Sequence, residues 1–147
     1  FTVTSRIPAG FHPFGISISP DGQHLYVVNV YEDTVSAIHL ATGKSEKIKV
    51  GIRPYCAAIS PDSKTIFVTN TQDDSVSVID ATSNQVIATI DVGGFPEGID
   101  FDAATQRVYV ASWSDDSVTV IDAKTHKVIN TISTGQQSRA FGRFILN

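Results

Sequence analysis

The residues in this chain that could carry out metal or nucleophile chemistry are few and scattered. His12, His24, His39 and His126 fall on different predicted turns and strands, so we do not expect them to converge on a zinc or copper ion. Cys56 is the only cysteine, and no histidine is placed by the sequence to activate it. We interpret it as a small buried hydrophobic residue, with a reactive thiol as the alternative. No nucleophile elbow, phosphate loop or dinucleotide motif is present, so the sequence predicts no catalytic residue, metal site or cofactor.

Carboxylates form a second set of candidates, because pairs of them recur at one predicted turn. Asp33, Asp74 and Asp116 are each followed by Thr or Ser. Such residues can bind a cation, but recurrence in every repeat favours a structural role, in which each aspartate caps its own loop. The preceding acids are expected to be solvated; they are Glu32, Asp73 and Asp115.

Composition limits the class of protein. Of the 147 residues, 41% are hydrophobic and 18% are charged, which excludes a disordered tail and a coiled coil. No apolar run approaches the ~20 residues that span a bilayer, so no membrane partner is predicted. The net charge of −4 offers no general attraction for a polyanion. The chain begins at Phe1 and has no methionine, so we expect a processed product or a piece of a longer protein.

The elements that position these residues form a repeat. Pro13, Pro54 and Pro96 lie 41 and 42 residues apart. Apolar triplets keep the same spacing, and so do the glycines and aspartates at Gly10, Gly51, Gly93, Gly135, Asp33, Asp74 and Asp116. A period of about 40 to 45 residues with four short strands is typical of β-propeller blades.

Within the first repeat, the pattern predicts strands at 15–19, 25–29, 35–40 and 46–50. The turn Ser19-Pro20-Asp21-Gly22 follows type I preferences. In the last turn, Gly43 is matched by Asn84 and His126, the residue types that best tolerate positive φ, so a left-handed conformation is predicted there in all three repeats.

The predicted fold class is all-β, a β-propeller of four-stranded antiparallel blades, with three full blades plus a strand at each end. The blades are 13–53, 54–95 and 96–137. Residues 1–12 are assigned the last strand of a preceding blade, over 3–9, and residues 138–147 the first strand of a following blade, over 140–146. Because a closed ring needs ~4 to 8 blades, we expect further blades, from a missing N-terminal part or another copy of the chain.

The repeat resembles the YVTN family of β-propeller proteins over essentially the whole chain. The motifs that carry this resemblance are Ser19–Asn29, Ser60–Asn70 and Asp74–Asp80, together with the Pro-x-Gly starts at Pro13 and Pro96. The resemblance implies a ring of about seven blades and an exported bacterial or archaeal protein, in the periplasm or at the cell surface. It implies no particular reaction. The chain departs from the pattern at Ser112, where the other repeats have asparagine, and at Cys56, where they have glycine.

In a propeller, the loops between the second and third strands share one face with the loops between blades, and we call it the channel-mouth face. The candidate ligand-binding residues on this face are His12, Phe14, Arg53, Tyr55, Phe95, Glu97, Trp113 and Arg139. Their types differ from blade to blade, which indicates a recognition surface rather than a repeated structural device.

Two alternatives stay open for these side chains. Trp113 is the only tryptophan, and binding and packing are equally consistent with its polar loop. Arg53, Tyr55, Arg139 and Phe141 could hold an anion or stack a base, but packing between blades is favoured.

The leading functional prediction is a non-enzymatic exported scaffold that binds a partner protein or a small ligand at the channel mouth. One alternative is a propeller enzyme, a lactonase or a quinone-dependent dehydrogenase, whose catalytic residues lie mainly in the missing blades; Glu97 and Arg53 are then the residues to examine. Another is single-stranded nucleic-acid binding, which the acidic loops of the same face disfavour because carboxylates repel phosphates.

Overall fold

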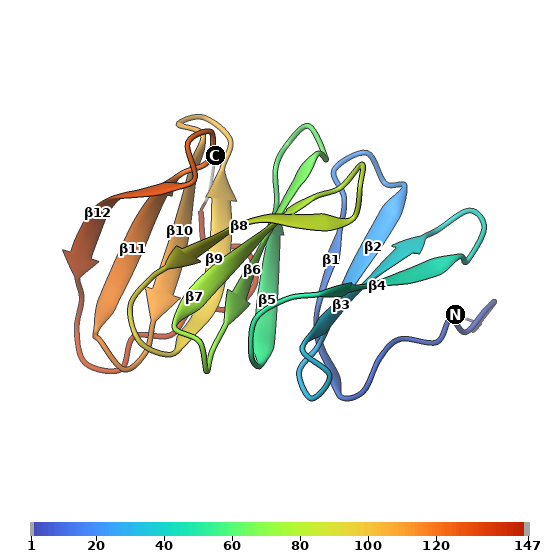
Figure 1. Cartoon of the computed structure of the whole chain (residues 1–147), viewed down its shortest axis with the longest axis horizontal. Coiled ribbons are helices and arrows are strands. Elements are labelled where there is room, and N and C mark those ends of the chain that lie inside the picture. The colour runs from blue at the N-terminus through green and yellow to red at the C-terminus, as the bar shows by residue number, and fades with distance from the viewer. Residues whose placement is uncertain (1, 146–147) are drawn as a thin grey trace.

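The computed structural model describes residues 2–145, which form twelve strands and no helix. The strands make three four-stranded antiparallel sheets, in the orders β1-β2-β3-β4, β5-β6-β7-β8 and β9-β10-β11-β12, that stand side by side as blades (Figure 1). The bounds are β1 Pro13–Ile18, β2 His24–Asn29, β3 Thr34–His39, β4 Ser45–Lys49, β5 Pro54–Ile59, β6 Thr65–Asn70, β7 Ser75–Asp80, β8 Gln85–Asp91, β9 Pro96–Asp102, β10 Arg107–Ser112, β11 Ser117–Asp122 and β12 Lys127–Ser133. Within residues 2–145, no helix is long and apolar enough to span a membrane.

The predicted turns are confirmed by their backbone. Gly22 has φ 71° and its N–H donates to the carbonyl of Ser19, 2.8 Å away, as a tight turn requires. In the turns between the third and fourth strands, Gly43, Asn84 and His126 have φ of 68°, 54° and 55°. The left-handed position predicted from Gly, Asn and His is therefore present in all three blades.

Two hydrophobic cores lie between the blades rather than within one. Tyr26, Val28 and Val35 of the first blade pack against Ile66 and Val68 of the second. A second cluster joins the other face of the second blade to the third blade through Phe67, Val76, Val78, Ile99, Phe101 and Val110. Since each sheet is apolar on both sides, stacking is what removes those sides from water.

Strand positions agree with the sequence prediction to within about two residues, the ordinary uncertainty of strand ends. The first strand of each blade begins at its proline, because the residue before it closes the preceding loop with positive φ. The second strand of the first blade begins at His24 rather than Leu25.

The two terminal strands are absent from the described residues, which corrects the prediction for both ends. Residues 2–12 form no strand, and none of the three sheets includes them. Residues 140–145 form no strand either; the predicted strand extends to Leu146, which lies outside the described residues.

Even so, residues 140–145 run beside β9 where a following first strand would lie. A Cβ added to Gly98 would collide with the carbonyl oxygen of Ala140, as one added to Gly15 would collide with that of Tyr55. The N–H groups of Phe144 and Ile145 donate to Oδ2 of Asp100, at 2.8 and 2.7 Å. Successive first strands are thus neighbours, and the channel-mouth residues that they carry come together.

Candidate functional site

Four candidate residues occupy the same place in four successive repeats, immediately after the proline or serine that starts the first strand. We call Phe14, Tyr55, Glu97 and Arg139 the inner row. The rings of Phe14 and Tyr55 lie 4.3 Å apart, between centroids. Nε of Arg139 lies 3.4 Å from Oε2 of Glu97. The inner row therefore has an aromatic half and a charged half.

Glu97 is the most enclosed charged residue of the inner row. Its side chain is 6% exposed, whereas that of Arg139 is 48% exposed. Oε2 of Glu97 is buried and has no hydrogen-bond partner among the described residues. The charge of this oxygen is opposed by the guanidinium of Arg139, so a ligand group that donates to it would share it with Arg139.

The other four candidates form a second layer around the inner row. The guanidinium of Arg53 stacks on the ring of Tyr31 at 4.1 Å, and the ring of His12 lies 4.3 Å from the same tyrosine. In the third blade the aromatic residue is one position earlier, at Trp113, which meets Phe95 edge to face at 5.6 Å and carries the guanidinium of Arg139 at 4.8 Å. Trp113 thus packs against Phe95 and Arg139, which is the packing interpretation, and a role in binding stays a prediction.

The eight candidate residues fall into two contact groups. His12 and Arg53 meet through Tyr31, while Phe95, Trp113, Arg139 and Glu97 are linked by direct contacts. Phe14 and Tyr55 join these groups along the inner row, and Tyr55 also reaches Phe141, with 6.4 Å between ring centroids.

Backbone strain at the blade junctions fixes where these side chains project. His12, Arg53, Phe95 and Gln137 all have φ between 53° and 56°, a conformation that side chains rarely adopt. The next residue is Pro or Ser, and it starts the first strand or occupies the equivalent place. Each residue of this kind is therefore held in one orientation and not left on a flexible loop.

The recurring aspartates hold these junctions. An Oδ1 oxygen of Asp33, Asp74 and Asp116 accepts the N–H of Arg53, Phe95 and Gln137, at 2.9, 2.8 and 2.5 Å respectively. The predicted structural role is confirmed, but each aspartate caps the loop that leaves its blade rather than its own loop.

The acids that precede these aspartates were expected to be solvated; Asp73 and Asp115 are exposed and Glu32 is half-buried, but two of the three also accept backbone hydrogen bonds. Oε2 of Glu32 accepts the N–H of Phe11 at 3.3 Å, and its Oε1 lies 2.7 Å from Nζ of Lys47. Oδ2 of Asp73 accepts the N–H of Ile52 at 2.6 Å. These acids hold the loop that enters their own blade, because that loop runs directly over them.

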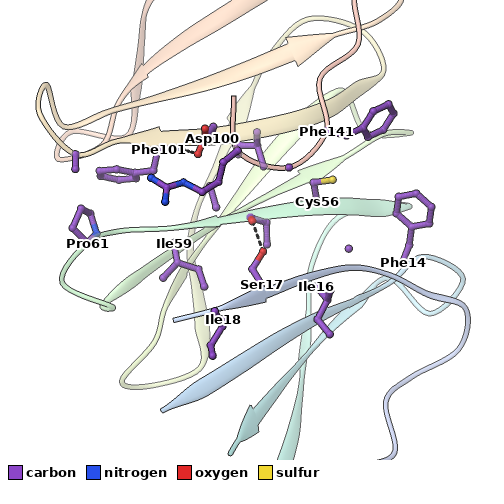
Figure 2. A pocket seen from close by; sticks show the side chains of 17 residues that line it. Phe14, Ile16, Ser17, Ile18, Cys56, Ile59, Pro61, Asp100, Phe101 and Phe141 are labelled. Atoms are coloured by element: carbon purple, nitrogen blue, oxygen red, sulfur yellow. Dashed lines mark hydrogen bonds between the residues drawn. The ribbon is translucent and has the colours of Figure 1, made fainter. Parts of the chain in front are cut away.

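Below the inner row, the first strands border a cavity of about 760 Å³ (Figure 2). Figure 2 shows Phe14 and Phe141 on either side of Cys56 at one end, with Ile18, Ile59 and Phe101 toward the other. Phe141 was named in the sequence analysis as a residue that could hold an anion or stack a base, whereas Asp100 and Arg143 were not predicted. The repeat alignment contained the signal for them, because Asp100 lies three residues after Glu97 on β9 and Arg143 lies four residues after Arg139.

The electrostatics of this corner favour a neutral thiol. Burial, with a smaller contribution from the charge of Glu97, raises the pKa of Cys56 to about 11. The N–H of Cys56 donates to Oγ1 of Thr69 at 3.1 Å. Burial also raises the pKa of the Tyr55 hydroxyl. The interpretation of Cys56 as a packed rather than reactive residue agrees with these surroundings.

The histidine prediction is partly wrong. Within the part of the chain that the structure describes, no three His, Cys, Asp or Glu side chains are placed to hold a metal ion together. His24 and His39, however, do meet, with 5.1 Å between ring centroids. Starting the second strand at Leu25 had placed His24 on a loop, where no such contact was expected.

Comparison with known proteins places this geometry in a family. Residues 42–146 match the model of the YNCE-like β-propeller. Among solved structures, Kuenenia stuttgartiensis hydrazine synthase is 31% identical, with a TM-score of 0.82, over 92% of this chain and 39% of that chain. U3-55K and the WD40 repeats of RRP9 are each 18% identical, with TM-scores of 0.78, over 85% of this chain and 40% and 39% of theirs, and they show the fold alone.

The chain spans about two fifths of the length of these solved structures. No curated protein matches it. The family model covers well over half of the residues, so this chain belongs to the YNCE-like β-propeller family.

Proposed function

We propose that this chain is a non-enzymatic binding scaffold whose channel-mouth face takes a partner protein or a small ligand. The observation that carries the proposal is the inner row. Four equivalent positions hold Phe, Tyr, Glu and Arg, whereas the junction aspartates at the same face are identical in every blade. The inner row therefore changes in charge and shape from blade to blade, as a surface that recognises one ligand would.

The chemistry of the row suits a ligand with two parts. Phe14 and Tyr55 offer aromatic surface, on which an apolar or aromatic group can pack. Next to them, Glu97 and Arg139 form an ion pair in which Oε2 of Glu97 accepts no hydrogen bond and the guanidinium of Arg139 is half-exposed. A ligand that carries an aromatic ring and one charged group would satisfy both halves.

Trp113 provides the test, because it is the single tryptophan of the chain and touches both Phe95 and Arg139. Phenethylamine and phenylacetate should each change its fluorescence in a saturable way. Glu97→Gln should weaken binding of the amine, and Arg139→Ala binding of the acid, by at least about tenfold, since each removes the partner of a charged group. Lys64→Ala, in a turn at the other end of its blade, is the control and should change neither affinity.

If neither probe gives a saturable signal, or if Glu97→Gln and Arg139→Ala bind both as the unmodified chain does, the mouth is not the binding site. Retention on single-stranded DNA that falls with salt would instead favour the nucleic-acid alternative.

The same proposal includes further blades and export. Blades of the YVTN type, from an N-terminal part of the protein or from another copy, would cover the apolar face of the first blade, where Ile16 and Ile18 are exposed. Asn29 supports the YVTN assignment, because its Oδ1 accepts the N–H of Gly10 at 2.9 Å. Location in the periplasm or at the cell surface is supported by the resemblance to that family.

A second candidate is a propeller within an enzyme, favoured by the 31% identity to hydrazine synthase. On this alternative, the catalytic groups lie outside this chain and the three blades position or bind another subunit. A metal or quinone signal in the purified full-length protein would support it, and a binding scaffold should give neither.

A further inference from the structure

Two histidines on neighbouring strands of the first blade face each other, at the end of the blade that is farthest from the channel mouth. His24 begins β2 and His39 ends β3, and the two are register partners in this antiparallel pair. Their ring centroids are 5.1 Å apart and their planes are 76° apart. Both side chains are half-buried, so each has one side open to water. Directly opposite residues of a sheet are close enough for both rings to reach one small ion.

The other two blades show what this position needs for folding. Its register pairs there are Thr65 with Asp80 and Arg107 with Asp122. Oδ1 of Asp80 accepts the N–H of Thr82 at 2.8 Å, and Oδ1 of Asp122 accepts that of Thr125 at 2.7 Å. In the second and third blades, the last residue of the third strand is thus an aspartate that caps the following turn, and the residue paired with it differs between the two blades.

The first blade differs from the other two at both facing positions, and it has histidine at each of them. Instead of an aspartate cap, Nδ1 of His39 lies 3.0 Å from Oγ1 of Thr42. This contact orients the ring of His39, and in the tautomer with the proton on Nδ1 the lone pair of Nε2 is free to bind a metal ion. His24 stacks on Tyr26 at 6.3 Å between centroids, which orients the second ring, and the other two blades fold the same turn with neither histidine.

The surroundings leave room for an ion. The two rings border a pocket of about 350 Å³, together with Lys44, Glu46 and Asn84. Oε2 of Glu46 accepts a hydrogen bond from Asn84 at 2.9 Å, so its carboxylate stays in the pocket and opposes the charge of Lys44. Among the described residues, no third His, Cys, Asp or Glu completes a metal group here.

We propose that His24 and His39 bind one Cu²⁺ ion, each through one ring nitrogen, with water in the remaining positions. Imidazole nitrogen suits copper, nickel and zinc, and affinities for one site peak at Cu²⁺. A structural zinc site needs four protein ligands and a catalytic one needs three, so two imidazoles and water favour copper over zinc. This site lies apart from the channel mouth and does not depend on binding there.

The experiment titrates the full chain with CuSO₄ alone, followed by calorimetry and by electron paramagnetic resonance, which counts the coordinated nitrogens. We expect one Cu²⁺ per chain with two nitrogens, and weaker binding of Zn²⁺. His24→Thr introduces the residue that the second blade has at this position, and it should lower the affinity for Cu²⁺ at least about tenfold. Removing a residue that only supports a metal ligand already costs about that much, so removing a ligand should cost no less. His39→Ala should have the same effect.

His126→Asn is the control, because asparagine is the second blade's residue at that turn and keeps its left-handed backbone. It should bind copper as the unmodified chain does. Unchanged affinity in His24→Thr, a spectrum with one coordinated nitrogen, or no binding by the unmodified chain would each overturn the proposal. If His39→Ala disturbs its turn, His24→Thr still decides, since the second blade folds with threonine there.

Discussion

The fourth strands of the second and third blades, β8 and β12, have nearly the same pattern but very different surroundings. Ile90 in β8 pairs with Val76, and Ile132 in β12 pairs with Val118, at equivalent register positions. Ile90 is 6% exposed and Ile132 is 44% exposed, whereas Ile48, their equivalent in β4, is 4% exposed. Because the residue type and its position in the sheet are the same, the difference in exposure comes from the presence or absence of a neighbouring blade.

The centre of the sheets shows the same difference. Phe67 is fully buried in the core that joins the second and third blades, whereas Tyr109 at the equivalent place in β10 is half-buried. Among residues 2–145, the segment 141–145 lies beside the first strand of the third blade, where the N–H groups of Phe144 and Ile145 donate to Asp100. A blade of this repeat therefore does not bury its own apolar faces, and most of its stability depends on what stacks against it.

The largest expected effect tests that dependence directly. Ile90→Ala should lower the free energy of unfolding by about 2 to 5 kcal/mol, the cost of truncating a buried aliphatic side chain. Ile132→Ala should cost about 1 kcal/mol or less, because nearly half of its surface is already in water. Urea unfolding of the two variants gives the comparison. Both lose a β-branched residue from a strand, so the difference between them reports burial by the next blade.

Equal losses in the two variants would contradict this account, since they would mean that the sheet itself, and not the neighbour, stabilises each fourth strand. A larger loss for Ile132→Ala would mean that the outer face of the third blade is covered in solution, as stacking of a second copy would produce.

A smaller effect is expected at the junctions. Asp74→Ala removes the acceptor for the N–H of Phe95 and places alanine at a φ of 50°, so it should cost about 1 to 2 kcal/mol. Asp116→Ala has the same local defects but frees only the segment that follows β12, so it should cost less in urea unfolding. Asp74→Asn keeps an acceptor and tolerates the backbone, and should stay close to the unmodified chain.

If Asp74→Asn loses as much as Asp74→Ala, the charge of the carboxylate matters more than its hydrogen bond, and the junctions would have to be described as ion pairs.

Much of this fold could be predicted from the sequence because each strand and turn pattern occurs in three aligned repeats. The left-handed turn position was recognised only because Gly43, Asn84 and His126 align, and the structure confirms it. The two end strands were predicted by the same alignment, and among the described residues neither 2–12 nor 140–145 forms a strand. Alignment assigns a residue to a place, and hydrogen bonding then needs a neighbour.

The sequence predicts where the residues of the candidate site lie in the blades, but it does not predict which side chains contact each other. The inner row follows from the repeat, yet nothing in the sequence shows that Glu97 is buried and forms an ion pair with Arg139. The pairing of His24 with His39 was missed because it depends on one residue at a strand end, where sequence patterns are least informative. Positions that repeat can be compared within the chain, whereas positions that differ need the structure.

The smallest expected effect concerns turns that depend on no neighbour. Hydrogen bonds from the Ser60 hydroxyl and the Lys64 N–H hold the pKa of the Asp62 carboxyl below its ordinary value of 3.8. Because the folded pKa is the lower one, this carboxylate stabilises the fold above about pH 4, and the contribution is lost as the pH falls through the folded pKa. In the third blade, the Thr105 hydroxyl lowers the pKa of Asp102 in the same direction.

Ser60→Ala and Thr105→Ala each remove the first cause of the lowered pKa. The midpoint of thermal unfolding should therefore fall less steeply from about pH 5 to pH 3 in both variants than in the unmodified chain. The decrease in slope should be similar for the two, although one turn is in an enclosed blade and the other in a blade with an open face. A clear difference in slope between the two variants would mean that the neighbouring blade affects these turns as well. The burial of Ile90 and the hydrogen bonds of Asp62 would then not contribute independently to the stability.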